Sequence, residues 1–137
     1  MNRDKIMILI FIIIAGGIFY YFQSLQDTTR LDETIGPLKQ KIAAANRPRV
    51  INFTAPWCPA CKQLKPVLNE VMNNYSRSVD CEILNVNDKG NLEMVRSFRV
   101  KAIPVTYVFD RKGNLVFKHV GYMGTQELDN QIRKTIL

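Results

Sequence analysis

The sequence predicts an α/β domain that follows one N-terminal apolar helix, and three observations support this fold class. The chain has 137 residues, so beyond the apolar segment at its start it has room for one domain of about 100 residues. The apolar pattern after Gly36 alternates between helical and strand periods, which is typical of an α/β domain. Hydrophobic content of 47% and charged content of 23% are those of an ordinary globular chain. We therefore expect a folded domain and no second catalytic domain.

An uncharged apolar segment at residues 6–22 predicts a transmembrane helix. As an α-helix this segment rises about 26 Å, which is near the lower limit for crossing a bilayer. Tyr20 and Tyr21 stand at its end, where aromatic rings suit the membrane interface. Residues 23–36 are mostly polar and are expected to form a stalk that carries the domain at residues 37–137.

The basic residues around this segment predict its orientation. Arg3 and Lys5 precede it, whereas the first basic residue after it is Arg30. The positive-inside rule therefore predicts a cytoplasmic N-terminus at residues 1–5 and a domain outside the cytoplasm. A cleaved signal peptide is the alternative, because the small residues at 15–17 suit a signal peptidase. A retained signal anchor is favoured because the uncharged stretch continues past them, and both readings place the domain in the same compartment.

The helices and strands of the domain are expected in the order α-β-α-β-α-β-β-α. Helices are predicted at residues 38–45, 58–75, 91–98 and from Thr125 onward, and strands at residues 49–54, 79–86, 105–109 and 115–120. Pro37 suits a first helical turn, Pro66 predicts a kink, and Thr125 can cap the last helix. The last two strands should form an antiparallel hairpin, whose turn contains Gly113 for a positive φ.

Two thiols at the predicted start of a helix, Cys58 and Cys61, are the candidate catalytic residues. Their C-x-x-C spacing closes a small disulfide ring, and unpaired backbone N–H groups at a helix start stabilise a thiolate on the first cysteine. Cys58 is then the nucleophile that forms a mixed disulfide with a substrate. Cys61, one turn further on and expected to be more buried, resolves that mixed disulfide.

Half of a zinc site is the competing interpretation of the C-x-x-C pair. Such a site needs four ligands, and beyond this pair the chain offers only Cys81 and His119 as soft ligands. Redox chemistry is therefore favoured, with no metal and no cofactor. Cys81 alternates with apolar residues on a predicted strand, so a buried inert thiol is favoured over a regulatory or intermolecular disulfide. His119 is expected to have a surface or structural role.

The sequence around the two cysteines resembles the active-site strand, turn and kinked helix of thioredoxins. The resembling segment reads F-T-A-P-W-C-P-A-C-K-Q-L-K-P-V-L-N-E-V-M-N-N-Y, and Pro66 falls where that family has its helix proline. Further on, K-A-I-P-V-T resembles the segment that carries the family's cis-proline, here Pro104, and Gly121 resembles a family glycine. The resemblance covers roughly residues 37–137. It implies a thioredoxin-like fold, a central mixed sheet flanked by helices, and protein-disulfide exchange.

The resemblance also implies roles for residues around the pair. Pro104 in the cis form would lie beside the active site, where it offers no N–H to the sulfurs. The Ile103 backbone would pair with an extended segment of the substrate. Trp57 would shield and position the site, although an aromatic ring next to a buried turn is often part of the core.

Asn52 departs from the thioredoxin pattern, because thioredoxins have a buried aspartate at the matching position. That aspartate is thought to assist proton transfer at the second cysteine, and asparagine cannot titrate. Asparagine there is similar to extracytoplasmic thioredoxin-like reductases that serve cytochrome c maturation. The departure leaves the proton acceptor for Cys61 unnamed.

The dipeptide Pro59-Ala60 between the cysteines favours a reductant. Strong disulfide donors of related families usually carry a histidine there, which stabilises the thiolate, and without it the reduction potential should be lower. A reductant outside the cytoplasm would need a membrane protein that passes electrons from cytoplasmic thioredoxin. The alternatives are a disulfide oxidase or isomerase, and a non-catalytic binding or assembly factor that needs neither cysteine.

The formal net charge of +7 does not predict nucleic-acid binding. Its Lys and Arg residues are spread along the chain, and no dense basic stripe with interleaved aromatic residues appears. A solvated basic surface is favoured. The expected partners are proteins with disulfides or thiols, together with the membrane.

Overall fold

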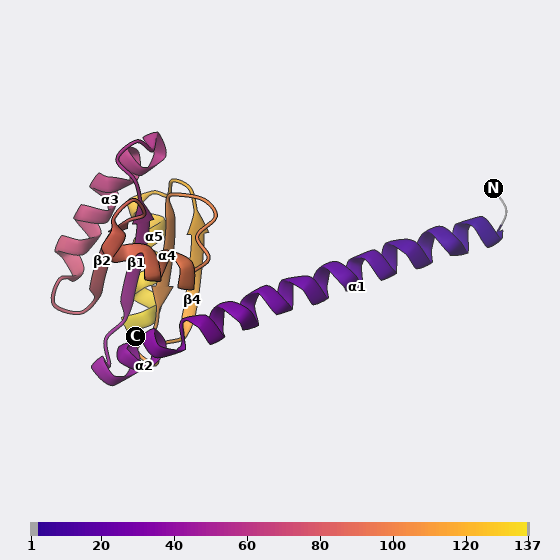
Figure 1. Cartoon of the computed structure of the whole chain (residues 1–137), viewed down its shortest axis with the longest axis horizontal. Coiled ribbons are helices and arrows are strands. Elements are labelled where there is room, and N and C mark those ends of the chain that lie inside the picture. Colours follow the sequence, from indigo (N-terminus) through magenta and orange to yellow (C-terminus); the bar gives the residue numbers. More distant parts are fainter. Residues whose placement is uncertain (1–2, 137) are drawn as a thin grey trace. The chain divides into compact units, whose positions relative to one another are not determined.

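The computed structural model describes residues 3–136, with side chains placed at residues 5–23 and 33–136. The chain divides into two compact units, residues 1–34 and 35–137 (Figure 1). The first contains α1 (Arg3–Thr34). The second contains α2 (Gly36–Ala45), β1 (Arg49–Thr54), α3 (Pro59–Tyr75), β2 (Asp80–Asn85), the 3₁₀ helix η1 (Lys89–Asn91), α4 (Leu92–Ser97), β3 (Val105–Phe109), β4 (Leu115–Val120) and α5 (Thr125–Ile136).

The first unit is a single helix with an apolar half. Within α1, the stretch Lys5–Gln23 has 19 residues and a mean hydropathy of 2.2, which is long and apolar enough to cross a membrane. A signal sequence near an N-terminus has the same property. The predicted stalk at residues 23–36 continues α1 as far as Thr34 and then enters α2 at Gly36. The side chains at 24–32 and most of the predicted cytoplasmic segment at 1–5 lie outside the described side chains.

The second unit confirms the predicted α/β fold and the predicted order of elements. Its four-stranded sheet has the order β2-β1-β3-β4. Strands β1 and β2 are parallel, whereas β3 is antiparallel to both β1 and β4. The parallel pair is joined through α3, and the antiparallel pair β3–β4 is the predicted hairpin (Figure 1). Because α3 follows β1 in the chain after a short loop, the start of α3 lies just past the end of β1.

Helices cover both faces of this sheet, so that the second unit has three layers. One face packs Val50 of β1 and Val108 of β3 against apolar residues of α3 and α5. The helical residues of this core are Leu64, Val67, Leu68, Val71, Leu128 and Ile132. The other face carries an aromatic cluster, in which Phe53, Tyr107 and Phe109 contact Phe98 or one another. Because both faces are covered, the central residues of β1 and all of β3 are buried, including the polar side chains of Asn52 and Thr106.

The β3–β4 turn shows why the predicted glycine is needed. Gly113 has φ +81°, and a Cβ there would overlap the backbone carbonyl of Lys39 in α2. The Asp110 carboxylate accepts hydrogen bonds from the backbone N–H groups of Lys112 and Asn114 at 2.9 and 2.8 Å. Burial alone would raise the pKa of Asp110, but these bonds and one from the Asn114 side chain lower it. The turn is therefore fixed by its own side chains and by α2.

The start of α5 and the proline inside α3 test two local predictions. Thr125 is the first residue of α5 rather than its cap, and its hydroxyl donates to Glu70 of α3 at 3.0 Å. The prediction that Thr125 caps α5 is therefore wrong by one position, because the Leu128 N–H donates to the Gly124 carbonyl and the helix starts from Gly124. Pro66 lies inside α3 as predicted, and as a proline it has no N–H to donate to the Lys62 carbonyl one turn earlier.

Candidate active site at the disulfide

The loop between β1 and α3 places two cysteines at the start of α3. Cys58 is the N-cap of that helix, with extended backbone, and its N–H donates to the Ala55 carbonyl at 3.2 Å. Cys61 lies one turn further on and is joined to Cys58 by a disulfide, with a Cα–Cα distance of 5.2 Å. The structure therefore brings together the two residues that the sequence predicts as the redox pair.

The backbone at the helix start is arranged to stabilise negative charge on Cys58. The Cys61 N–H donates to the Cys58 Sγ at 3.2 Å, so the first sulfur takes the place of an N-cap oxygen. Pro59 occupies the first helical turn, where its missing N–H costs no hydrogen bond. When the disulfide opens, the positive end of α3 favours the thiolate of Cys58.

Both cysteines are buried to the same extent, since each residue is 4% exposed. The predicted greater burial of Cys61 is therefore not seen at the level of whole residues. What distinguishes the two sulfurs is their surroundings. Cys58 Sγ is bonded by a helix N–H and lies 3.9 Å from the Ile103 carbonyl oxygen, whereas Cys61 borders a pocket described below.

The Ile103–Pro104 loop comes from a distant part of the chain and packs beside the pair. Its peptide bond is cis, as the sequence resemblance implied. The Ile103 side chain packs against the small core of Ala55, Cys58 and Cys61. The Gly121 N–H donates to the Pro104 carbonyl at 2.7 Å, so the end of β4 holds this loop in place.

Trp57 is 64% exposed, and it is therefore not part of the core. The alternative that its ring belongs to the core is wrong. An indole ring next to Cys58 that stays in solvent provides an apolar contact surface without burying its own area in the fold. Tyr122, which follows Gly121, is also exposed.

Asn52 is 1% exposed and lies on β1 opposite Thr106 of β3. Its amide nitrogen donates to the Thr106 hydroxyl at 2.9 Å and to the Val105 carbonyl at 3.3 Å. Its Oδ1 has no hydrogen-bond partner among the described protein atoms. The side chain therefore links β1 to β3 as a donor, which a carboxylate could not do.

Comparison with known proteins agrees with this geometry. The family model described as thioredoxin matches residues 32–134, a stretch that contains the whole sheet, the disulfide and the Ile103–Pro104 loop.

The chain belongs to the thioredoxin family.

Three relatives illustrate the range of the match. A thiol:disulfide interchange protein TxlA homolog of Synechocystis is 26% identical over 95% of this chain and 73% of its own length. Thioredoxin H5 of Arabidopsis thaliana is 32% identical over 74% of this chain and 84% of its own. Thioredoxin 1 of Synechococcus elongatus is 29% identical, covering 74% and 92% of the two chains. As a thioredoxin-family protein with a Cys58–Cys61 disulfide, the chain is a thiol-disulfide oxidoreductase whose substrates are thiol-containing proteins.

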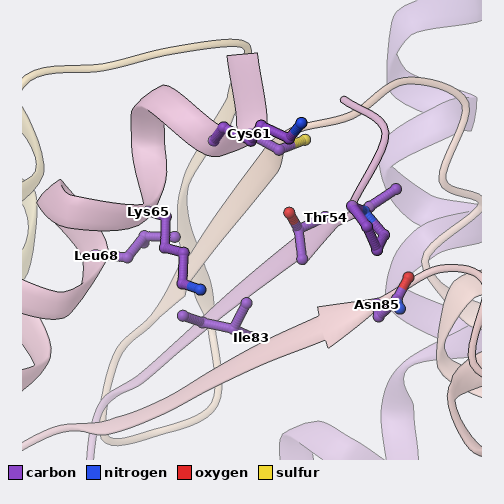
Figure 2. A pocket seen from close by; sticks show the side chains of 9 residues that line it. Thr54, Cys61, Lys65, Leu68, Ile83 and Asn85 are labelled. Atoms are coloured by element: carbon purple, nitrogen blue, oxygen red, sulfur yellow. The ribbon is translucent and has the colours of Figure 1, made fainter. Parts of the chain in front are cut away.

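A pocket of about 390 Å³, which the sequence did not predict, borders this thioredoxin-type disulfide. It lies between α3, the end of β1 and β2, and its lining includes Cys61, Lys62, Lys65, Thr54, Ile83 and Asn85 (Figure 2). The signal was present in the spacing of Lys62 and Lys65, which places both on one side of α3. The sequence could not show that β2 lines the other side of the pocket, because β2 lies beside α3 only in the tertiary fold.

Cys81 and His119 lie on other elements. Cys81 is a free, half-buried thiol on β2, where burial and the Asp80 carboxylate raise its pKa to about 11. His119 lies on β4, where its Nε2 is 3.1 Å from the Tyr122 carbonyl and its ring stacks on Phe117. Among the residues that the structure describes, no three His, Cys, Asp or Glu side chains gather as a metal-binding group.

Proposed function

We propose that this protein is a membrane-anchored reductant of protein disulfides that works outside the cytoplasm. The observation that carries the reaction is the hydrogen bond from the Cys61 N–H to the Cys58 Sγ at the N-terminus of α3. That bond stabilises Cys58 as a thiolate, and a thiolate is the species that attacks a disulfide.

In the proposed reaction, reduced Cys58 attacks one sulfur of a substrate disulfide and forms a mixed disulfide. The other substrate sulfur leaves as a thiolate and takes a proton from water. Cys61 then gives up its proton and attacks Cys58, which re-forms the Cys58–Cys61 disulfide and releases the second substrate thiolate. The closeness of the two residues, with Cα atoms 5.2 Å apart, makes this second step intramolecular.

The Ile103–Pro104 loop supports a role in substrate binding. Ile103 lies against the disulfide, and Pro104 offers no N–H to the sulfurs. We infer that the Ile103 backbone pairs with an extended segment of the substrate, and that exposed Trp57 covers the apolar side of that segment. Pro59, Ala60 and Asn52 then shape the site without touching the substrate disulfide.

Two features support a reductant rather than an oxidant or isomerase. The dipeptide Pro59-Ala60 carries no histidine to stabilise the thiolate further. Asn52 stands where thioredoxins have an aspartate, and asparagine at this one position resembles the extracytoplasmic thioredoxin-like reductases. We therefore propose a substrate such as an apocytochrome c and an electron donor in the membrane that draws on cytoplasmic thioredoxin.

The stretch Lys5–Gln23 supports the proposed anchor, with residues 6–22 in the bilayer, 23–36 as the stalk and 37–137 outside. The proposed topology puts residues 1–5 in the cytoplasm. Alkaline phosphatase fused after Leu137 should be active in intact bacteria and should remain in the membrane fraction. An inactive fusion would reject the topology, and an active fusion released from the membrane would show cleavage.

The direction of the reaction is tested on the full chain in detergent micelles. Equilibration with dithiothreitol should give a reduction potential near that of thioredoxin, about −270 mV, and the protein should reduce insulin disulfides. A value near −120 mV would show an oxidant instead. If the function of the protein in the cell survives replacement of both Cys58 and Cys61, a non-catalytic binding or assembly factor is favoured.

A further inference from the structure

The turn that follows β4 lies beside the Ile103–Pro104 loop. The Gly121 N–H donates to the Pro104 carbonyl at 2.7 Å, which is the hydrogen bond that joins the two segments. The chain bends at Gly121, whose φ is +103°. Because Pro104 follows Ile103 directly, the position of the Ile103 backbone depends on the conformation of this turn.

Glycine at residue 121 permits the turn but does not fix it. Glycine adopts a positive φ without strain, and it also leaves the backbone free to take other conformations. Among the described residues, no atom beyond the chain neighbours of Gly121 lies within 4 Å of the place that a Cβ would occupy there. The hydrogen bonds and the flanking residues of the turn therefore have to hold it.

His119 supplies a hydrogen bond that spans Gly121. Its Nε2 lies 3.1 Å from the Tyr122 carbonyl oxygen, so the bond joins a residue before the turn to a residue after it. A carbonyl oxygen only accepts hydrogen bonds, and the contact therefore requires the proton on Nε2. The imidazole ring also stacks on Phe117, with ring centres 6.2 Å apart and an interplanar angle of 8°. This stacking limits the orientations of the ring.

The bond from His119 goes to the backbone of Tyr122 and not to its ring. The Tyr122 side chain is 51% exposed, whereas the next residue, Met123, is 1% exposed and belongs to the core. The turn is thus held at three points, which are the Pro104 carbonyl, the His119 ring and the buried Met123 side chain.

We propose that His119 is a positioning residue for substrate binding. By holding the Tyr122 carbonyl it fixes the turn at Gly121, and through the bond from Gly121 to Pro104 it fixes the Ile103 backbone. The inference rests on the proposed function, in which the Ile103 backbone pairs with an extended segment of the substrate. His119 acts on the affinity for a protein substrate and not on the exchange between sulfurs.

The test separates substrate affinity from thiol chemistry in the full chain in detergent. His119→Ala should raise KM for insulin about fivefold and leave kcat unchanged, because one hydrogen bond that supports binding is lost. The reduced protein should react with hydroxyethyl disulfide, which has no peptide backbone, within about twofold of the wild-type rate. An unchanged KM, or an equal loss with both disulfides, would overturn the proposal.

Two amide variants test whether the hydrogen bond is the cause. The side-chain nitrogen of glutamine reaches about as far as Nε2 of histidine, so His119→Gln should keep KM within about twofold of wild type. Asparagine is one carbon shorter, and His119→Asn should therefore behave like His119→Ala. Urea unfolding of each variant checks that it is folded. The same KM in all three variants would overturn the proposal, because the bond to Tyr122 would then have no effect.

His119 is the one histidine of the chain, so its NMR signals are assigned without ambiguity. Long-range proton–nitrogen correlation should show the neutral ring with its proton on Nε2. A proton on Nδ1 would overturn the proposal, because two acceptors would then face each other.

The proposed function and this inference fail in different ways. If the wild-type protein reduces insulin and His119→Ala has the wild-type KM, the positioning role fails while the proposed reductant activity stands. If the wild-type protein reduces hydroxyethyl disulfide but not insulin, the proposed function fails and the inference fails with it.

Discussion

The active-site pair and Cys81 are thiols of one small domain in opposite electrostatic settings. Cys58 caps a helix, where a backbone N–H points at its sulfur. Cys81 lies on strand β2, where half-burial and the neighbouring Asp80 carboxylate raise its pKa to about 11. Exposure does not explain the contrast, because the active-site cysteines are 4% exposed and Cys81 is more open than either.

The backbone around a thiol therefore decides its chemistry in this fold. A helix N-terminus offers unpaired N–H groups, and these favour a thiolate. A strand uses its N–H groups in the sheet, so a thiol there gains no such stabilisation and suffers the cost of burial. The same residue type is therefore a nucleophile at residue 58 and is expected to be inert at residue 81.

The largest expected effect is the loss of activity on replacing the nucleophile. Cys58→Ser should lower insulin reduction by about 1,000-fold or more, because a serine hydroxyl does not form disulfides. Cys81→Ser should keep nearly all of the activity. The measurement is the initial rate of insulin reduction with dithiothreitol as donor. Comparable losses of activity in Cys58→Ser and Cys81→Ser would contradict the assignment of Cys58 as the nucleophile and Cys81 as an inert thiol.

Alkylation of the reduced protein should separate the thiols over a wide pH range. At pH 7 Cys58 should react with iodoacetamide about 100-fold faster than Cys81 or more, since only the thiolate attacks. The rate at Cys81 should rise with pH up to about pH 11, in line with its raised pKa. Peptide mass spectrometry of quenched samples gives both rates in one experiment. Equal rates at pH 7 would contradict the assignment of Cys58 as a stabilised thiolate and of Cys81 as a thiol with a raised pKa.

The sequence predicted those parts of the molecule that depend on local patterns. The order of elements, the hairpin glycine at 113 and the redox pair follow from periodicity, turn chemistry and C-x-x-C spacing. The family resemblance added the Ile103–Pro104 loop, which no local pattern connects to Cys58. The structure shows the two 3.9 Å apart, between the Cys58 sulfur and the Ile103 carbonyl.

The parts that the sequence missed depend on contacts between distant elements. The pocket at Cys61 needs β2 beside α3, and the hydroxyl of Thr125 is taken by Glu70, which lies 55 residues away. The exposure of Trp57 was equally undetermined, because an aromatic residue after a strand suits core and surface alike. Local rules could name such residues but not their partners.

Asn52→Asp would place a carboxyl group in the core, where Asn52 is 1% exposed. We expect a loss of about 2 kcal/mol in the free energy of unfolding at pH 7, since the Val105 carbonyl loses its donor and a charge is buried. Burial should raise the pKa of the new carboxyl above its unfolded value of about 3.9. The loss should therefore be smallest below that unfolded value and should grow as pH rises through the folded pKa.

Urea unfolding of the full chain at pH 4 and pH 7 measures this change. Asn87→Asp adds the same charge at an exposed position and is the control, for which almost no loss is expected. Equal losses in the two variants, or a loss independent of pH, would contradict the assigned role of Asn52 as a buried donor.

Ala60→His should make the helix start still more favourable to a thiolate. An imidazolium beside Cys58 stabilises the reduced form, so the reduction potential should rise by about 30 mV, which corresponds to about 1.4 kcal/mol. The rise should be larger below the histidine pKa of about 6.5, where the ring is charged. Dithiothreitol equilibration at pH 6 and pH 8 gives the values, with Ala60→Gln as a control of similar size. A rise of the same size in Ala60→Gln would show that charge is not the cause.

The smallest expected effect concerns Cys81 and tests the strand setting directly. Its pKa of about 11 in the folded protein exceeds the value of about 8.5 for an unfolded thiol. The neutral thiol therefore contributes stability that is fully present below about pH 8.5 and is lost as the pH rises toward 11, because the unfolded chain gives up this proton first. Cys81→Ala lacks the group, so wild-type protein should lose about 0.8 kcal/mol relative to the variant between pH 7 and pH 9. Urea unfolding of both proteins in one detergent measures this difference, in which the titration of other groups cancels.

A difference in stability between wild type and variant that stays constant over this pH range would mean that the Cys81 thiol has the same pKa in the folded and unfolded chains. The contrast between the two thiols would then depend only on the helix N-terminus at Cys58.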